Sequence, residues 1–324
     1  MNIPEELQQA IDALMNSNDT CKMRENVTTI CSRYLYESGQ GKKLVKTPDE
    51  VIAYAVSRMP ATYCAVYTAL ESMRERYSGQ IHSLLDFGSG TGAVSWAADA
   101  LFPLEHIVCV EREQYMMNAA KKMLDYGASE ALKHTTWFHA SVTSELPQIE
   151  SCDLVTASYI MNELQENDKN VFLDHVWNHA NDVIMIIEPG TTAGYHNIIM
   201  AREYFLHKGA NLIAPCIHNG VCGLAEKDWC HFSCRLQRNK MQKFVKNGDA
   251  PYEDEKFSYI IASKSNVDVN QDMRIIRHPV IKKGYVDLKV CASDGIRNVK
   301  VTARDKALFK MVKKANWGEI VNLG

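Results

Sequence analysis

Three glycines at alternate positions form the strongest chemical pattern in the chain. The segment from Asp86 to Gly92 reads DFGSGTG and lies between a short apolar run and a helix-forming run. Glycine lets the backbone approach a bound nucleotide closely and adopt turns that other residues resist. The segment therefore predicts a nucleotide site, with Asp86, Gly88, Ser89, Gly90 and Gly92 among its cofactor-binding residues.

Glu111 is the second candidate cofactor ligand. It ends a predicted strand 19 residues beyond Gly92, where a carboxylate can accept hydrogen bonds from both ribose hydroxyls. The glycine loop also fits a relaxed dinucleotide fingerprint, so a dinucleotide and a vestigial empty site both stay open. S-adenosylmethionine is favoured because Asp86 precedes the first glycine by two residues, the glycines alternate, and a helical region precedes the first strand.

Four polar residues follow the fourth predicted strand. In α/β sheets, ligands bind at the carboxyl ends of the strands. Ser158, Tyr159, Asn162 and Glu163 are therefore candidate catalytic residues, and Ser158 is also a candidate cofactor ligand. The alternative is that Asn162 and Glu163 only begin the next helix. The motifs of amino-directed and cytosine-C5 methyltransferases are absent here, so neither the acceptor atom nor a catalytic base is predicted.

A cysteine cluster lies in the C-terminal half. Four cysteines and two histidines lie within the 19 residues from Cys216 to Cys234, and Cys291 follows at the end of a predicted strand. Thiolates gathered in this way in a reducing compartment indicate a metal site, with chance clustering of buried cysteines as the alternative. The spacing matches neither a zinc ribbon nor a ferredoxin, so zinc and an iron–sulfur cluster both remain possible.

The elements that must position these residues fall into four parts. Alternating strands and helices predict an α/β fold of the class I methyltransferase (Rossmann-like) type, with a parallel sheet and helices on both faces. Predicted strands cover 82–87, 106–111, 136–140, 153–158 and 183–188. We expect a helical N-terminal region over 1–80, the methyltransferase core over 81–208, a Cys-rich metal-binding insert over 209–250, and a basic, β-rich segment over 251–324 that completes the fold. In this last segment we expect a hairpin turn at 282–284.

Composition limits the location and the class. The chain is 46% hydrophobic and 23% charged, which is typical of a globular protein. It contains no apolar run long enough for a transmembrane helix, so we expect no membrane association. The N-terminus lacks the basic and apolar regions of a signal peptide and is too acidic for an organelle transit peptide, so the expected location is cytoplasmic.

Charge is distributed unevenly along the chain. Residues 231–317 carry 19 Lys and Arg against 9 Asp and Glu, whereas the remainder carries 17 against 30. A basic segment on an acidic protein predicts a polyanionic partner, RNA before membrane, and no DNA is expected. The alternative is a solvated basic surface.

Several motifs together resemble the family of small-ribosomal-subunit assembly methyltransferase-like proteins, which is known in mitochondria and has bacterial relatives. The motifs span nearly the whole chain after residue 30, and the glycine loop and the cysteine segment occur in the same order. The residues that carry the resemblance are Met59 to Tyr63, Asp86 to Gly92, Ser158 to Leu164, Glu188 to Thr191, Ala214 to His218, Trp229 to Ser233 and Arg277 to Pro279.

The resemblance implies a four-iron, four-sulfur cluster ligated by Cys216, Cys222, Cys230 and Cys291. Cys234 lies where the family does not require cysteine and is an alternative ligand. The resemblance further implies action on the small ribosomal subunit or its RNA. Three functions follow as hypotheses: an RNA methyltransferase, a non-catalytic ribosome-assembly and RNA-binding factor, and a methyltransferase for a substrate other than RNA.

Overall fold

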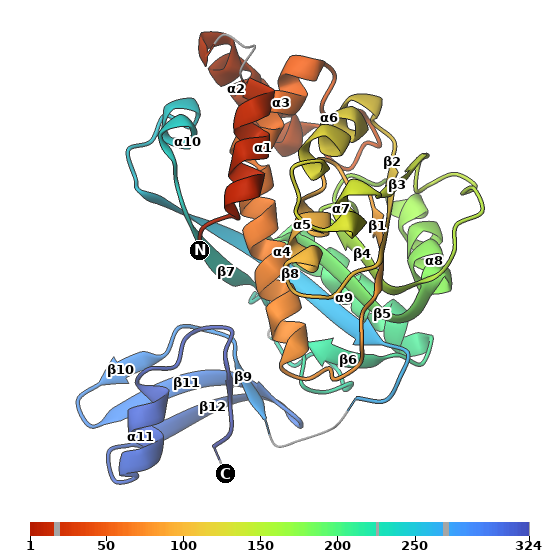
Figure 1. The fold of residues 1–324 in the computed structure, drawn as a ribbon. Helices are drawn as coiled ribbons and strands as arrows, with labels where there is room; N and C mark the ends of the chain where they lie inside the picture. Colours follow the sequence, from red (N-terminus) through yellow and green to blue (C-terminus); the bar gives the residue numbers. More distant parts are fainter. Residues whose placement is uncertain (16–19, 225–226, 268–271, 324) are drawn as a thin grey trace.

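The computed structural model describes residues 1–15, 20–224, 227–267 and 272–323. Their core is an eight-stranded sheet in the order β3-β2-β1-β4-β5-β8-β6, and β7 pairs with the free part of β8 (Figure 1). Its strands are β1 (Ser83–Phe87), β2 (His106–Glu111), β3 (Thr136–His139), β4 (Cys152–Ser158), β5 (Ala180–Pro189), β6 (Asn211–Ala214), β7 (Phe232–Gln237) and β8 (Tyr252–Ser263).

Strand direction identifies the fold. The strands from β3 to β5 run parallel, whereas β8 runs antiparallel to β5, β6 and β7. The first strand thus lies in the middle of the sheet, and one reversed strand lies between β5 and β6. This arrangement confirms the predicted α/β fold of the class I methyltransferase type and corrects one detail, because the sheet is mixed rather than wholly parallel.

Helices cover both faces of this sheet (Figure 1). Side chains alternate along a strand, so Leu84 packs into the core on the side of α4, α5 and α6, whereas Leu85 packs against α8 and α9. The helices are α1 (Glu5–Met15), α2 (Thr20–Tyr36), α3 (Pro48–Ser57), α4 (Met59–Arg74), α5 (Ala93–Asp99), α6 (Gln114–Leu124), α7 (Glu130–Lys133), α8 (Lys169–His179), α9 (Thr192–His207), α10 (Lys240–Val245) and α11 (Lys306–Val312), with a short 3-10 turn, η1 (Glu166–Asp168).

The N-terminal helix α3 begins with a side-chain cap. The Thr47 hydroxyl accepts a hydrogen bond from the Glu50 amide at 3.2 Å, and Pro48 occupies the first turn of α3. Such a cap supplies a partner for an amide that has none within the helix. A buried ion pair of 2.7 Å between Arg33 of α2 and Glu50 then joins α2 to α3. These two helices lie beside the carboxyl ends of the central strands.

The C-terminal residues form a second sheet. Its order is β10-β11-β9-β13, with β12 paired to β11, and it has its own small apolar core. The predicted turn at Gly284 is confirmed, because Gly284 has φ of 86° between β10 and β11. The strands are β9 (Met273–Ile275), β10 (Val280–Lys282), β11 (Tyr285–Ala292), β12 (Gly295–Thr302) and β13 (Ile320–Val321).

The division of the chain into four parts stays a prediction. The structure adds that β6 and β7, from the Cys-rich stretch, and β8, from the basic segment, all belong to the eight-stranded sheet. No helix among the described residues is long and apolar enough to span a membrane.

Candidate functional site

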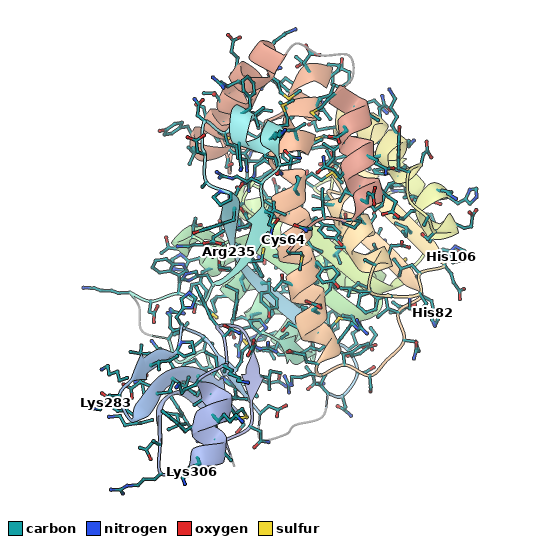
Figure 2. The ribbon with its side chains drawn as sticks, turned by 60° about the vertical axis from the view of Figure 1, so that its left-hand side comes forward. Cys64, His82, His106, Arg235, Lys283 and Lys306 are labelled. Atoms are coloured by element: carbon teal, nitrogen blue, oxygen red, sulfur yellow. The ribbon has the colours of Figure 1, made fainter. Side chains whose placement is uncertain are left out.

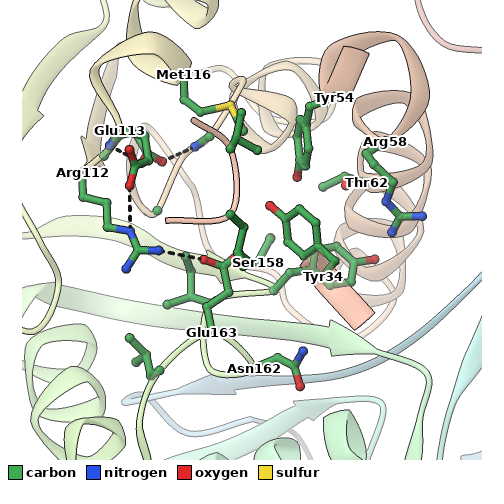
Figure 3. A pocket seen from close by; sticks show the side chains of 18 of the residues that line it. Tyr34, Tyr54, Arg58, Thr62, Arg112, Glu113, Met116, Ser158, Asn162 and Glu163 are labelled. Atoms are coloured by element: carbon green, nitrogen blue, oxygen red, sulfur yellow. Dashed lines mark hydrogen bonds and ion pairs between the residues drawn. The ribbon is translucent and has the colours of Figure 1, made fainter. Parts of the chain in front are cut away.

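A cavity of about 420 Å³ opens at the carboxyl ends of β1, β2 and β4 (Figure 3). Its volume falls within the usual range for small-molecule sites, about 300–1,000 Å³. We call it the glycine-lined cavity. The predicted residues that line it are Gly88, Gly90, Glu111, Ser158, Tyr159, Asn162 and Glu163.

The glycine loop forms one wall of this cavity under tight steric limits. Gly88 has φ of 67°, and a Cβ atom placed there would lie 1.9 Å from Cδ1 of Ile160. Gly90 has φ of 53°, and its amide donates a hydrogen bond of 2.7 Å to Oε2 of Glu111. A left-handed backbone and a close neighbour both favour glycine. The loop therefore keeps its backbone exposed to whatever occupies the cavity.

Glu111 links the glycine loop to the start of α6. Its Oε1 accepts a hydrogen bond of 2.8 Å from the Glu113 amide, and its side chain is buried. Burial raises its pKa, against the lowering effect of these two amide bonds. Each carboxylate oxygen can accept a second hydrogen bond, so Glu111 retains capacity for hydroxyl donors in the cavity.

Three predicted cofactor residues lie beneath the cavity rather than on its surface. Asp86 accepts a hydrogen bond of 2.7 Å from the Thr156 hydroxyl, and burial raises the pKa of Asp86 to about 8. The Ser89 hydroxyl donates to the Asp86 carbonyl at 2.8 Å. Gly92 has φ of 83° and is the N-cap of α5. These residues shape the turn between β1 and α5 from below.

The segment after β4 contributes a strained backbone at Tyr159 and a hydroxyl group at Ser158 to the cavity. Tyr159 has φ of 64°, which is costly for a residue with a bulky side chain, and its hydroxyl donates to Oε1 of Glu255 at 3.2 Å. The buried Ser158 hydroxyl has no hydrogen-bond partner among the described residues. An orphaned hydroxyl at the cavity wall is the expected state of a group that meets a ligand.

Glu163 is the most strongly perturbed carboxyl group that faces the cavity. Burial raises its pKa to about 7, and the Arg112 guanidinium, 3.3 Å away, opposes this rise. A carboxyl group with a pKa near neutrality can take up or release a proton at physiological pH. Figure 3 shows the ion pair between Glu163 and Arg112 as a dashed line.

Most residues that line the glycine-lined cavity were not predicted from the sequence. Arg112, Met116 and Ser141 follow β2 and β3, so their places at the carboxyl ends of strands could have indicated them. Tyr34 and Tyr54 come from α2 and α3. No pattern in the sequence indicated that the N-terminal helices would form a wall of this cavity, because that depends on tertiary packing.

A second, smaller cavity brings together the cysteines that the family resemblance implied. Cys216, Cys222, Cys230 and Cys291 all line it, together with residues of α9, β8 and the second sheet. We call it the cysteine-lined cavity. Its free space is only about 30 Å³, roughly the volume of one water molecule. Residues far apart in the chain thus bring four cysteines to the wall of one small cavity.

The thiols lie in a buried environment that has several polar neighbours. Burial raises the pKa of Cys291 to about 12, and the neighbouring Cys216 adds to this rise, while the Ile217 amide lowers it by hydrogen bonding. The Tyr195 hydroxyl lies 3.5 Å from Sγ of Cys222. In the part of the chain that the structure describes, however, no three His, Cys, Asp or Glu side chains form a group that could hold a single metal ion.

Cys234 lies elsewhere. It is a buried residue of β7 and contacts Cys64 of α4. A hydrogen bond between the two thiols lowers the pKa of the Cys64 thiol. It does not line the cysteine-lined cavity. Its expected role as an alternative metal ligand stays a prediction.

The strand order and the glycine-lined cavity at its carboxyl edge define a methyltransferase-like protein of class I. Sequence comparison is more specific. The chain belongs to the family of the mitochondrial small ribosomal subunit protein Rsm22, whose family model matches residues 48–322. This confirms the family resemblance.

Two curated relatives illustrate the match. The human protein "Ribosome assembly protein METTL17, mitochondrial" is 27% identical over 294 residues, which cover 83% of this chain and 62% of the relative. "Rsm22-cox11 tandem protein 2, mitochondrial" from Schizosaccharomyces pombe is 24% identical over 333 residues, which cover 86% of this chain and 44% of the relative. The chain therefore spans less than two thirds of either relative.

Solved methyltransferase structures are only distantly similar. The magnesium protoporphyrin IX methyltransferase of Synechocystis, solved with bound S-adenosylmethionine, aligns with a TM-score of 0.41 and 12% identity, over 78% of this chain and 99% of that one. The plantazolicin methyltransferase BpumL gives 0.42 and 11%, over 80% and 99%. The fold assignment rests on strand order and direction instead.

The expectation of a cytoplasmic location is wrong. The matching family and both relatives are mitochondrial proteins, which points to mitochondria. The expectation rested on the acidic N-terminus of the sequence. The composition of a few residues is weaker evidence of location than a family match over most of the chain.

Proposed function

We propose that this chain binds S-adenosylmethionine and acts on the small ribosomal subunit or its RNA as a methyltransferase. One observation carries the proposal. The glycine-lined cavity places the Gly88–Gly90 backbone, the Glu111 carboxylate and an orphaned Ser158 hydroxyl around one space of about 420 Å³. These are the groups that a nucleoside with an amino-acid tail requires: close backbone approach, an acceptor for ribose hydroxyls and a polar hydroxyl.

The residues of the cavity can be given roles. Gly88, Gly90 and Glu111 would hold the nucleoside part of the donor, and Ser158 would meet its polar tail. The donor supplies a methyl group on a positively charged sulfur. Glu163 would accept a proton from the acceptor, because a pKa of about 7 leaves much of it ionised at neutral pH. Arg112 would hold Glu163 in place through their ion pair.

The second sheet supports an RNA partner. The exposed cations Lys283, Arg304, Lys306, Lys310 and Lys314 form no ion pair with any residue that the structure describes. Figure 2 shows Lys283 and Lys306 pointing outward from this sheet and α11. Exposed cations without ion-pair partners can bind a phosphate backbone. The names of the relatives, a ribosome assembly protein and an Rsm22 protein, agree with a ribosomal partner.

We also propose that the cysteine-lined cavity binds a four-iron, four-sulfur cluster through Cys216, Cys222, Cys230 and Cys291. Tetrahedral zinc holds sulfur atoms about 3.8 Å apart, since each Zn–S bond is about 2.3 Å. The four thiols share one cavity without forming a group suited to a single ion, and a cluster separates its ligands more widely. The donor set fits, although the cysteine loops must move outward to admit a cluster.

A non-catalytic assembly factor is the second candidate. This function is favoured because polar groups around the glycine-lined cavity already form hydrogen bonds or ion pairs with other residues of the protein. The Tyr159 hydroxyl donates to Glu255, Glu163 pairs with Arg112, and both oxygens of Glu111 already accept amide hydrogen bonds. Such a site can bind a donor as a structural ligand without transferring its methyl group.

One set of measurements separates these functions. The protein is purified without oxygen, and iron, acid-labile sulfide and zinc are measured. It is then titrated with S-adenosylmethionine by calorimetry, and labelled methyl transfer to small ribosomal subunits is followed. Donor binding with a methylated nucleotide supports the methyltransferase. Donor binding with RNA affinity but no methylation supports the assembly factor. Methylation of another substrate without RNA affinity overturns both ribosomal roles, and absence of donor binding overturns the assignment of the cavity.

A further inference from the structure

Two arginine side chains are among the most completely buried groups in the protein. Arg202 of α9 is 1% exposed and Arg274 of β9 is 0% exposed. Each guanidinium pairs at one end with a half-exposed carboxylate: Glu203 at 2.7 Å from Arg202, and Glu75 at 3.2 Å from Arg274. Taking a charged group out of water is strongly unfavourable unless nearby charges and hydrogen bonds compensate. The burial of these two charged side chains must therefore be compensated by groups around them.

Both arginines hold the loop that carries Cys216. Arg274 Nε donates to the Pro215 carbonyl at 3.0 Å, and Arg202 Nη2 donates to the carbonyls of His218 and Gly220. A third guanidinium, that of Arg76, donates to the Cys216 carbonyl at 3.2 Å. The loop carbonyls are thus turned toward the arginines. The Ile217 amide between them points to the Cys291 thiol instead.

The guanidinium groups are not fully satisfied by these contacts. Nε of Arg202 and Nη2 of Arg274 are buried and have no hydrogen-bond partner among the residues that the structure describes. Arg202 itself lines the cysteine-lined cavity. Buried donors without partners are rare and indicate a ligand or ion that completes them. An anion is the partner that would both accept these hydrogen bonds and balance the positive charge of the guanidiniums.

We propose that Arg202 and Arg274 compensate the charge of an anionic tetrathiolate metal centre in the cysteine-lined cavity. The proposal rests on the metal site proposed above. Four thiolates around a cluster of charge +2 carry a net charge of −2, and the two guanidiniums offset it. Their paired carboxylates lie toward solvent, where water screens them. Arg202 and Arg274 are thus positioning residues: they fix the Cys216 loop by hydrogen bonds and stabilise the centre by charge.

The test compares two substitutions that separate charge from hydrogen bonding. Arg202→Gln keeps an amide that can donate to the loop carbonyls but removes the charge. Arg202→Lys keeps the charge but loses the planar fork of donors. Arg235→Gln is the control, because Arg235 lies on β7 outside the cavity and pairs with Asp254 at the surface (Figure 2). All proteins are purified without oxygen, and circular dichroism checks that each is folded.

Two quantities are measured on the loaded proteins: the rate of iron loss to a chelator and the midpoint potential of the bound cluster. In Arg202→Gln we expect at least tenfold faster iron loss and a more negative midpoint potential, because an added electron meets less positive charge. In Arg202→Lys the potential stays near that of the wild type while iron loss is intermediate. Arg235→Gln matches the wild type in both.

The outcomes distinguish the arginine roles from the metal site itself. A wild-type protein that holds neither iron and sulfide nor zinc overturns the proposed cluster and the charge role together. A loaded wild type whose Arg202→Gln variant has unchanged iron loss and potential overturns the charge role alone. If Arg202→Gln does not fold, Arg274→Gln replaces it with the same expectations. If neither folds, Arg202→Lys decides, because an unaltered potential supports the charge role and a shifted one overturns it.

Discussion

Gly88 and Gly90 differ in what a side chain would meet. At Gly88 a Cβ would collide with Ile160, whereas at Gly90 the nearest heavy atom is the Gly88 carbonyl oxygen at 4.0 Å. A side chain at Gly90 can therefore be accommodated by the protein but would extend into the glycine-lined cavity. This makes Gly90 the better position for testing ligand binding without disturbing the fold.

Gly90→Ala should weaken S-adenosylmethionine binding at least tenfold. The control is Gly284→Ala, because Gly284 also has a positive φ, with nothing within 4 Å of its added Cβ, and lies in the β10–β11 turn. Both variants should lose roughly 1–2 kcal/mol of unfolding free energy from the left-handed backbone. Calorimetric titration and thermal unfolding measure the two effects. Equal donor affinity in both variants would mean that the cavity is wrongly assigned.

The residues of the glycine loop were predictable because their chemistry is local. Gly88, Gly90 and Glu111 follow from one segment and one strand end. That the Asp86 side chain does not line the cavity was not predictable, because the sequence does not show how β1 is oriented about its own axis. The Thr156 hydroxyl that binds Asp86 comes from β4, some 70 residues later in the chain.

At the scale of elements, two cysteines that are close in the sequence differ in their position relative to β7. Cys230 precedes β7 and faces the cysteine-lined cavity, with its carbonyl accepting from the Ser258 hydroxyl at 2.8 Å. Cys234 lies within β7 and packs against α4 beside Cys64. The two thiols therefore belong to different environments, although only four positions separate them.

Cys230→Ser should abolish metal binding, whereas Cys234→Ser should leave it intact. The first change removes a proposed ligand, and the second replaces a buried thiol that does not line the cavity. Iron and sulfide analysis measures both, and donor titration should give the same affinity in each variant as in the wild type. Loss of metal in Cys234→Ser with a folded protein would instead restore Cys234 as a ligand.

Elements with a regular periodicity of apolar residues were predictable from the sequence, whereas elements with an unusual composition were not. The strands from β1 to β5 are short apolar runs followed by helices, and their order follows from topology rules. Strands β6 and β7 were not predicted, because the cysteines, histidines and glycines around them obscure the alternation of apolar and polar residues. Before the predicted hairpin turn, the structure has two short strands, β9 and β10, separated around Pro279.

At the scale of the whole molecule, three buried carboxyl groups should make stability depend on pH. Burial raises the pKa of Glu163 to about 7 and those of Asp86 and Glu188 to about 8. A group whose pKa is higher in the folded state than in the unfolded state stabilises the fold below its unfolded pKa. That stability is lost as pH rises through the folded pKa.

We therefore expect the free energy of unfolding to fall between pH 6.5 and pH 8.5. Glu163 contributes at most about 1 kcal/mol to this fall, because most of its stabilisation is already lost below pH 6.5, so the fall comes mainly from Asp86 and Glu188. Burial lowers the pKa of His175, His218 and His231 below the ordinary value, which favours their neutral forms in this range. Urea unfolding at both pH values measures the effect. Asp86→Asn should show a smaller fall, and an identical fall would exclude Asp86 as a contributor.

The basic second sheet should govern the salt dependence of RNA binding. Replacing Lys306, Lys310 and Lys314 with glutamine should reduce the slope of log affinity against log salt by about 2, since each phosphate contact contributes about 0.7 on single strands. Replacing Lys121, Lys122 and Lys133 with glutamine is the control, because it makes the same charge change on α6 and α7. Filter binding to ribosomal RNA at several salt concentrations measures the slope. Equal slopes in the two triple variants would place the RNA elsewhere.

Strand β8 contacts both cavities. Glu255 holds Tyr159 and Arg58, which line the glycine-lined cavity, and four residues later Tyr259 lines the cysteine-lined cavity. Along a strand this is a distance of about 14 Å. Thermodynamic linkage requires that two ligands of one protein affect each other equally. If metal loading changes donor affinity by some factor, donor binding changes metal affinity by the same factor. An unchanged donor affinity in Cys230→Ser would show that this factor is one and that the two sites are filled independently.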